Sequence, residues 1–218
     1  MPFSHHSHSG EFCPSHAQNT LEQVIQTAIL QGMEIEAGVT SSSMISNEAK
    51  YFMTAIQLRK KYASQIKILV GFESEWIRSD TSLRLIHDSL SRHPFEFFVG
   101  SVHHLHGIPI DWSRKLYSKA REVSGGTDER IFEDYFDVQF EMLQNLKPMI
   151  VGHFDLIRLH SDNPNASDGG FRRWTGVWQR VARNLRYISS YGGLLELNSA
   201  ALRKGLEMPY PAAEVCQV

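Results

Sequence analysis

Four short apolar runs, each bounded by glycine or turn residues, are spaced along the chain. They predict buried β-strands, because strands that are covered on both faces have continuous apolar residues instead of an alternating pattern. The runs are IKILVGFE (residues 66–73), FEFFVGSVH (95–103), KPMIVGHFD (147–155) and GGLLELNS (192–199).

Longer segments with apolar residues at helical spacing lie between and before these runs, and they predict helices. The segments are residues 19–31, 47–62, 81–91, 130–145 and 175–191. This alternation of strands and helices favours an α/β fold with a mainly parallel sheet or barrel and helices outside it. With 218 residues and 42% hydrophobic content, the chain can bury one sizeable core, so we expect a single domain over residues 1–218.

The N-terminal segment and the predicted strands each end in polar side chains that can bind a metal ion or a substrate. In chain order these residues are His6 and His8, Glu73, His103, His153 with Asp155, and Glu196 with Asn198. Any one of them could be an ordinary polar group at a strand end. Because the carboxyl ends of barrel strands surround one mouth, a series of such residues predicts a shared site.

The stretch HHSHSGEFCPSH (residues 5–16) contains four of the eleven histidines of the chain. An expression tag or a solvated terminus could account for it, although a tag is usually an unbroken run. In a strand, His6 and His8 would share a face, because side chains alternate with a period of two. Two imidazoles on one face are half of a metal coordination shell, so a metal site is the third interpretation.

Charge and composition limit the classes of molecule that the protein is expected to bind. The formal net charge of −2 argues against a protein that mainly binds nucleic acid or anionic membranes, so a small molecule is the expected partner. We find no run of about 18 apolar residues and no signal-peptide pattern, which predicts a cytoplasmic protein. The two cysteines have no CxxC spacing, so neither a disulfide framework nor a zinc ribbon is indicated. Nothing in the sequence indicates an oligomeric state.

Imidazoles combined with a carboxylate, without cysteine, suit Zn, Fe or Mn. A carboxylate such as Glu73 can bridge two ions. A site with several ions is suited to hydrolysing phosphate esters, because it activates water and neutralises the charged oxygens.

Five segments together resemble the motifs of histidinol-phosphatases of the PHP (polymerase and histidinol phosphatase) superfamily, most closely the fungal type. They are HSHSGEFCPSH, ILVGFESEW, FFVGSVHHLHGIPID, IVGHFDLIRLH and LLELNSAALRKGLEMPYP, in the family's order. The resemblance implies a distorted (β/α)7 barrel with up to three divalent metal ions. It also implies hydrolysis of L-histidinol phosphate to L-histidinol and phosphate in histidine biosynthesis, by a metal-bound hydroxide and without a side-chain nucleophile.

The resemblance also assigns roles to single residues. The implied metal ligands are His6 and His8 for the first ion, Glu73 as the bridging carboxylate, His103 and His153 for the second ion, and His16 for the third. Arg158, Arg203 and Lys204 are plausible phosphate contacts, with surface solvation as the alternative for Arg158 and Lys204. Supporting or substrate-binding groups are expected at His104, His106, Asp155 and Asn198. For His87, His93 and His160 a role away from the site is the expected one.

The chain departs from the family pattern in two places. After the first predicted helix the family has a strand ending in a Thr-Glu-His type motif, whereas here Met33 leads into EIEAGVTSSS, and no histidine occurs between His16 and His87. We therefore expect the second strand to be missing near residues 33–34. A late Asp-x-His motif of the family has no counterpart before Val218. The predictions are an incomplete barrel and fewer than three bound ions.

Three alternative functions remain open. A PHP-type phosphoesterase could act on another small phosphorylated substrate, because metal ligands determine the reaction and pocket residues determine the substrate. A catalytically impaired, metal-binding derivative of the enzyme is the second. The third is a PHP exonuclease module, against which the near-neutral charge and the lack of a basic groove count.

Overall fold

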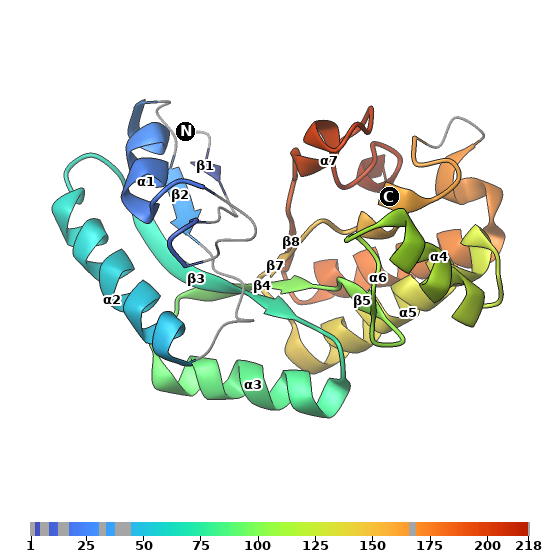
Figure 1. Ribbon diagram of the computed structural model, residues 1–218, viewed down its shortest axis with the longest axis horizontal. Helices are drawn as coiled ribbons and strands as arrows, with labels where there is room; N and C mark the ends of the chain where they lie inside the picture. The colour runs from blue at the N-terminus through green and yellow to red at the C-terminus, as the bar shows by residue number, and fades with distance from the viewer. Residues whose placement is uncertain are drawn as a thin grey trace. The chain divides into compact units, whose positions relative to one another are not determined.

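The computed structural model describes residues 3–4, 9–12, 18–30, 34–37, 45–165 and 169–217. Within these residues, a six-stranded sheet has the strand order β1-β2-β3-β4-β7-β8, and β5 and β6 form a separate antiparallel hairpin (Figure 1). The strands are β1 (Phe3–Ser4), β2 (Glu34–Ala37), β3 (Ile68–Glu75), β4 (Phe97–Ser101), β5 (His104–Leu105), β6 (Ile108–Pro109), β7 (Ile150–Val151) and β8 (Leu194–Leu195). The pairs β1·β2, β2·β3 and β7·β8 are parallel, as the alternation of strands and helices predicts.

The helices follow the predicted order. They are α1 (Leu21–Leu30), α2 (Ile45–Lys61), α3 (Ser79–Arg92), α4 (Arg114–Val123), α5 (Asp128–Leu146), α6 (Thr175–Ser190) and α7 (Ala200–Arg203), with 3-10 helices η1 (Leu156–His160), η2 (Gly170–Arg173) and η3 (Val215–Gln217). The five predicted helices and the four predicted strands are confirmed, with ends shifted by a few residues. Helix α4 was not predicted, because its sequence is largely polar and buries only Tyr117 and Ala120.

One prediction was wrong. A strand does lie between β1 and β3: β2 pairs in parallel with both, with Ile35 opposite Ser4 on one side and Ile68 on the other. Strand pairing uses backbone N–H and C=O groups, so four residues without a long apolar run are sufficient to form it. The expectation of a missing strand near residues 33–34 relied on the lack of a long apolar run and of a Thr-Glu-His type motif, and neither decides backbone pairing.

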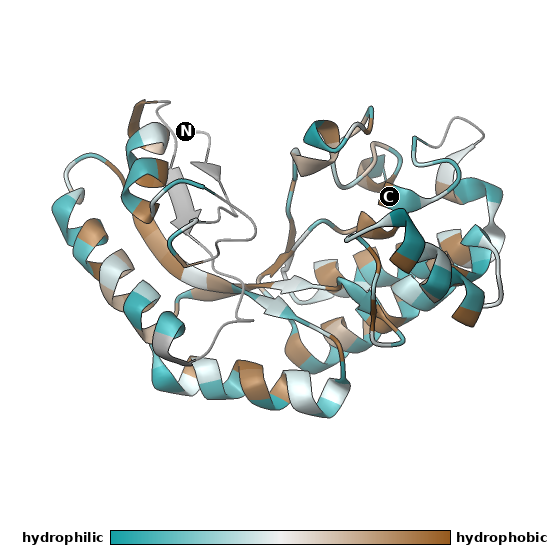
Figure 2. Ribbon diagram, in the orientation of Figure 1, coloured by the Kyte–Doolittle hydropathy of each residue, from teal (hydrophilic) through white to brown (hydrophobic). Residues whose placement is uncertain are grey.

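The contacts divide the chain into two compact units. Unit 1 comprises Met1–Glu75 and Arg84–Val99, and unit 2 comprises Trp76–Leu83 and Gly100–Val218. In the core of unit 1, the buried face of α2 packs toward β3, where the Tyr51 hydroxyl donates to the Gly71 carbonyl over 2.8 Å. Apolar residues recur along α2 between polar ones (Figure 2), and their spacing of three or four residues is the pattern of a helix with one buried face.

The core of unit 2 is built around α5 and α6. Side-chain amides inside it are paired with backbone: Asn184 Nδ2 donates to the Phe136 carbonyl over 2.8 Å, and Gln139 Nε2 donates to the Phe154 carbonyl over 2.8 Å. Buried polar groups are costly unless they are bonded in this way. The second bond fixes the backbone next to His153.

Glycines let chain segments approach closely near the predicted site. A Cβ atom on Gly71 would lie 2.6 Å from the ring of Phe97, and one on Gly100 would lie 2.6 Å from the Pro148 ring. Both distances are too short for any side chain. Close packing therefore requires glycine at positions 71 and 100, within the two apolar runs.

No helix in the described part of the chain is both long enough and apolar enough to cross a membrane.

Candidate metal centre

The backbone holds His153 in an unusual conformation directly after β7. Its φ is 23°, in the left-handed region that residues other than glycine seldom adopt. Two hydrogen bonds stabilise this turn: the His153 N–H donates to Glu196 Oε2 over 2.9 Å, and the Leu156 N–H donates to the His153 carbonyl over 2.9 Å. Strained positions of this kind persist where the surroundings fix them, and they are common at functional sites.

His103 follows β4 and lies beside His153. The two imidazole centroids are 4.6 Å apart with an interplanar angle of 59°. The His103 carbonyl accepts the N–H of Ile110 over 2.9 Å, which ties the residue after β4 to the segment after β6. His103 is half-buried and His153 is only 6% exposed.

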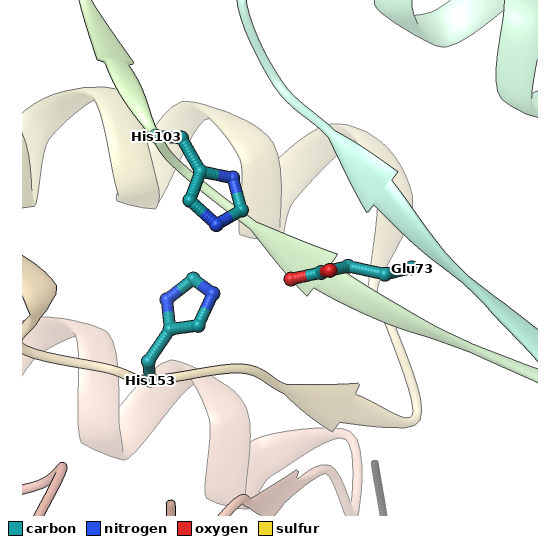
Figure 3. A group of neighbouring side chains, drawn as sticks. All are labelled: Glu73, His103 and His153. Carbon is teal, nitrogen blue, oxygen red and sulfur yellow. The ribbon is translucent and has the colours of Figure 1, made fainter. Parts of the chain in front are cut away.

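Glu73 completes the group from β3. Its side chain is 2% exposed, and one donor atom each from Glu73, His103 and His153 lie within 4.8 Å of one another (Figure 3). Donors about 2.0–2.2 Å from one zinc ion are at most roughly 4.4 Å apart, so side-chain shifts of less than about 1 Å would suffice for binding. Two imidazoles and a carboxylate are a donor set that suits a divalent metal ion. The residues present therefore fit such an ion.

A buried ion pair lies two residues after His153. Asp155 is fully buried. Its Oδ2 accepts hydrogen bonds from Nε of Arg158 over 3.0 Å and from the N–H of Ala212 over 2.7 Å. Burial raises the pKa of Asp155, while the charge of Arg158 and these hydrogen bonds oppose the rise. The pair joins η1 to the chain after Tyr210.

A family model named PHP domain matches residues 4–200 of the chain. The chain belongs to the PHP domain family. It is 38% identical over 236 residues to a Schizosaccharomyces pombe protein named "Probable histidinol-phosphatase", covering 100% of this chain and 76% of the relative. It is 30% identical over 263 residues to the histidinol-phosphatase of Saccharomyces cerevisiae, covering 99% of this chain and 78% of that protein. Both matched stretches are longer than this chain of 218 residues, so each relative carries residues without a counterpart here.

Two solved structures resemble this PHP domain. One is a candidate histidinol phosphatase from Listeria monocytogenes, with a TM-score of 0.83 and 20% identity over 100% of this chain and 89% of that one. The other is a histidinol phosphate phosphatase from Lactococcus lactis in complex with Zn, L-histidinol and phosphate, with a TM-score of 0.68 and 20% identity over 91% of this chain and 72% of that one. The matches show the fold, and with the parallel strand pairs they agree with the expected PHP-type barrel that is incomplete.

The structure brings together three of the six predicted ligands of the PHP domain, Glu73, His103 and His153. The other three, His6, His8 and His16, lie outside the described residues.

Arg158, predicted as a possible phosphate contact, is 2% exposed, which excludes the alternative of surface solvation. Besides Asp155, it donates to the carbonyls of Pro164 and Met208 over 3.0 and 2.9 Å, and also to the Pro209 carbonyl. All three of its nitrogens are therefore bonded to the protein.

The remaining predicted residues take different places. Arg203 and Lys204 are exposed at the end of α7. Asn198 is half-buried and caps the backbone, because its Oδ1 accepts the N–H of Ala200 over 2.8 Å. His104 begins β5. His106 is on the hairpin turn, where its Nε2 lies 3.0 Å from Ser124 Oγ and 3.1 Å from Asp134 Oδ2.

Sequence reasoning missed two residues that are linked to the histidine pair through the backbone or through ring packing. Asp111 follows Ile110, the residue whose N–H bonds to His103, and Tyr210 packs its ring 6.5 Å from that of His153. Both lie inside segments that carried the family resemblance, GIPID and EMPYP. Their position in those motifs was the available signal, but neither is at a predicted strand end.

Proposed function

We propose that this chain is a metal-dependent phosphomonoesterase that hydrolyses L-histidinol phosphate to L-histidinol and phosphate in histidine biosynthesis. The observation that carries the proposal is the 38% identity, over the whole chain, to the Schizosaccharomyces pombe protein named "Probable histidinol-phosphatase". The donor group of Glu73, His103 and His153 supports it, because ligands of this kind suit the metal ions that such hydrolysis needs. The cytoplasmic location and the absence of nucleic-acid partners stay predictions.

Each residue of the donor group has a defined task in this proposal. His103 and His153 bind the ion as neutral imidazoles, and Glu73 adds a negative charge that favours a divalent cation. Glu196 fixes the His153 backbone and hence the direction of its side chain. When bound, the metal supplies Lewis-acid activation of water and neutralises charge on the phosphate. Which of Zn, Fe or Mn is bound, and the participation of His6, His8 and His16, belong to the same proposal.

We assign phosphate contacts to Arg203 and Lys204. Both side chains are exposed near the end of α7, so their charged groups are accessible to a ligand. A guanidinium binds phosphate bidentately, and an ammonium adds a point charge. The nitrogens of Arg158 already bond to Asp155 and to backbone carbonyls, so we propose a structural role for it.

The test is phosphate release by protein loaded in turn with Zn, Fe or Mn. We expect L-histidinol phosphate to be hydrolysed with a kcat/KM at least about 100-fold above that for glucose 6-phosphate or glycerol 3-phosphate, and with a kcat of about 1–10³ s⁻¹. Chelator-treated protein is the control and should be inactive. Equal turnover of all phosphomonoesters would contradict the proposed substrate and favour a PHP phosphoesterase of other specificity.

A second candidate is a metal-binding derivative with impaired catalysis. The observation in its favour is the absence of any histidine between His16 and His87, where the resemblance places a ligand. This candidate predicts that the loaded protein binds L-histidinol but releases phosphate at less than about one thousandth of ordinary enzyme rates. Calorimetric titration with L-histidinol beside the phosphate assay separates the two.

A further inference from the structure

Asp111 follows a residue whose backbone is bonded to the histidine pair of unit 2. Strand β6 ends at Pro109, and the next residue, Ile110, donates its N–H to the carbonyl of His103. Asp111 is therefore one residue, about 3.6 Å along the chain, from a backbone bond to a proposed metal ligand. Its own backbone is held as well, because its carbonyl lies 3.3 Å from Nε2 of His160. Asp111 is half-buried and so is accessible to a ligand.

The carboxylate of Asp111 has no hydrogen bond of ordinary length with any described residue. Its charged neighbour is Lys204, whose Nζ lies 3.9 Å from Asp111 Oδ2, beyond the hydrogen-bond range. The Lys204 side chain is 43% exposed, so it can move toward solvent or toward a phosphate at little cost. With only this long ion pair among the described residues, the Asp111 carboxylate is available for another cation.

Buried polar atoms surround the same place. Tyr210 is 1% exposed, its ring lies 6.5 Å from that of His153, and its hydroxyl has no hydrogen-bond partner among the described residues. Oδ1 of the fully buried Asp155 also has none within that part of the chain. Buried polar atoms are nearly always bonded, so these two atoms can bind a polar ligand or an ordered water.

The charges of the two carboxylates also act on Tyr210. Burial raises the pKa of Tyr210; the charge of Arg158 opposes this rise, and the negative charges of Asp155 and Asp111 add to it. The hydroxyl therefore lies within the field of both carboxylates. Arg158 is already paired with Asp155, so the charge that faces Asp111 is that of Lys204, at the long distance of 3.9 Å.

We propose that Asp111 binds the ammonium group of L-histidinol phosphate, with the Tyr210 hydroxyl beside it, and thereby selects amino-alcohol phosphates over phosphomonoesters without an amine. The inference rests on the proposed function. In the substrate, the amine is on the carbon next to the CH2–O–P group, so its counterion must lie a few ångströms from the phosphate. Asp111 meets this requirement, because Lys204, a proposed phosphate contact, is its neighbour.

The experiment compares L-histidinol phosphate with its analogue lacking the amine, 3-(imidazol-4-yl)propyl phosphate. The unmodified protein should prefer the amine by about 10- to 150-fold in kcat/KM, the value of one hydrogen bond between charged groups. In Asp111→Asn this preference should fall to about threefold or less. Tyr210→Phe, which removes an unbonded hydroxyl and keeps the ring, should lower the preference by a smaller factor.

Asp134→Asn is the matched control. It removes the same charge from an exposed carboxylate that pairs with His106 on the surface, and the substrate preference should not change. Calorimetric titration with L-histidinol measures binding without turnover. In this titration Asp111→Asn should weaken the affinity by about 10- to 150-fold, the factor expected for the amine preference.

The outcomes separate the two proposals. If Asp111→Asn slows both substrates equally and keeps the preference, Asp111 is structural and the inference is overturned. The inference also fails if the unmodified protein does not distinguish the two substrates. If the protein hydrolyses sugar phosphates but neither imidazole compound, the proposed function itself fails.

Discussion

Unit 2 contains a fully buried ion pair, and unit 1 contains a pair that is much more exposed. In unit 2, Asp155 and Arg158 form a pair whose side chains are 0% and 2% exposed. In unit 1, the pair of Arg59 and Glu96 has side chains 37% and 36% exposed. A surface pair contributes little to stability, whereas a buried pair whose partner is removed leaves an uncompensated charge in the core. The buried pair of unit 2 should therefore matter more for stability than the exposed pair of unit 1.

The apolar cores explain this difference. Among the described residues, the core of unit 2 contains 26 buried hydrophobic residues and that of unit 1 contains 12. The larger core can enclose Asp155, Arg158 and Glu196 and still bond them from several elements. The polar groups that hold His153 are fixed by the same packing that stabilises unit 2. Positions near the donor group are thus sensitive to substitution for both folding and chemistry.

The largest expected effect comes from the donor group of Glu73, His103 and His153. His153→Ala and Glu73→Ala should each lower metal-dependent phosphatase activity by about 10³-fold or more, because each removes a ligand and Glu73 is the proposed bridge. His87→Ala, at an exposed position of α3, is the control and should retain activity. Steady-state phosphate release measures the effect. Near-normal turnover in Glu73→Ala would remove this metal site from the proposal.

The second-largest effect concerns the number of metal ions bound per chain. The purified protein should bind between one and two ions of Zn, Fe or Mn per chain, because the chain lacks histidines where the resemblance places further ligands. Elemental analysis after dialysis measures this number. His153→Ala should lower it by about one ion, whereas His87→Ala should not. Three tightly bound ions per chain would contradict the ligand count.

Breaking an ion pair should cost more in unit 2 than in unit 1. Arg158→Met should lower the free energy of unfolding by about 3–5 kcal/mol, because Asp155 would lose its buried counterion. Arg59→Met makes the same change in an exposed pair and should cost less than about 1 kcal/mol. Urea denaturation measures both.

The double variant Arg158→Met with Asp155→Leu should recover part of the loss, because no unpaired charge then remains. If Arg158→Met keeps full stability but weakens substrate binding, the phosphate contact first expected for Arg158 would be favoured instead.

The smallest effect concerns acid stability in the part of the chain where α2 meets α3. Burial raises the pKa of Glu48, but hydrogen bonds from Arg92 and Ser89 outweigh it, and the net pKa is below the ordinary 4.5. A carboxylate with a lowered folded pKa stabilises the protein above its unfolded pKa, and this contribution is lost as the pH falls through the folded value.

Glu48→Gln should therefore lower the melting temperature at pH 7 and narrow the difference from the unmodified protein below about pH 4. Glu141→Gln, at an exposed position of α5, provides the control. A difference between Glu48→Gln and the unmodified protein that is constant between pH 3 and pH 7 would contradict this assignment.

Much of the fold could be predicted because its long elements have strong periodic signals. Helix α5 and strand β3 have a buried face or a buried run that the sequence displays directly. Helix α4 and strand β2 could not be predicted, because α4 is mostly polar and β2 is defined by its backbone partners. Short elements depend on neighbours that are distant in the sequence, and the local hydropathy pattern gives no information about those neighbours.

The sequence by itself determined the donor types and their order, since Glu73, His103 and His153 each lie at or just beyond an apolar run that must be a buried strand. Only the tertiary structure decided which neighbouring charges are available. Arg158 was expected to contact phosphate or solvent, yet its nitrogens bond to Asp155 and to carbonyls near residue 208. Asp111 was not singled out, yet it follows the residue bonded to the His103 carbonyl, and within the part of the chain that the structure describes its carboxylate has only a long ion pair. The reason is physical: desolvation and hydrogen bonding depend on contacts between residues far apart in the sequence, such as Asp155 and Ala212, which are 57 positions apart, and no local pattern records them.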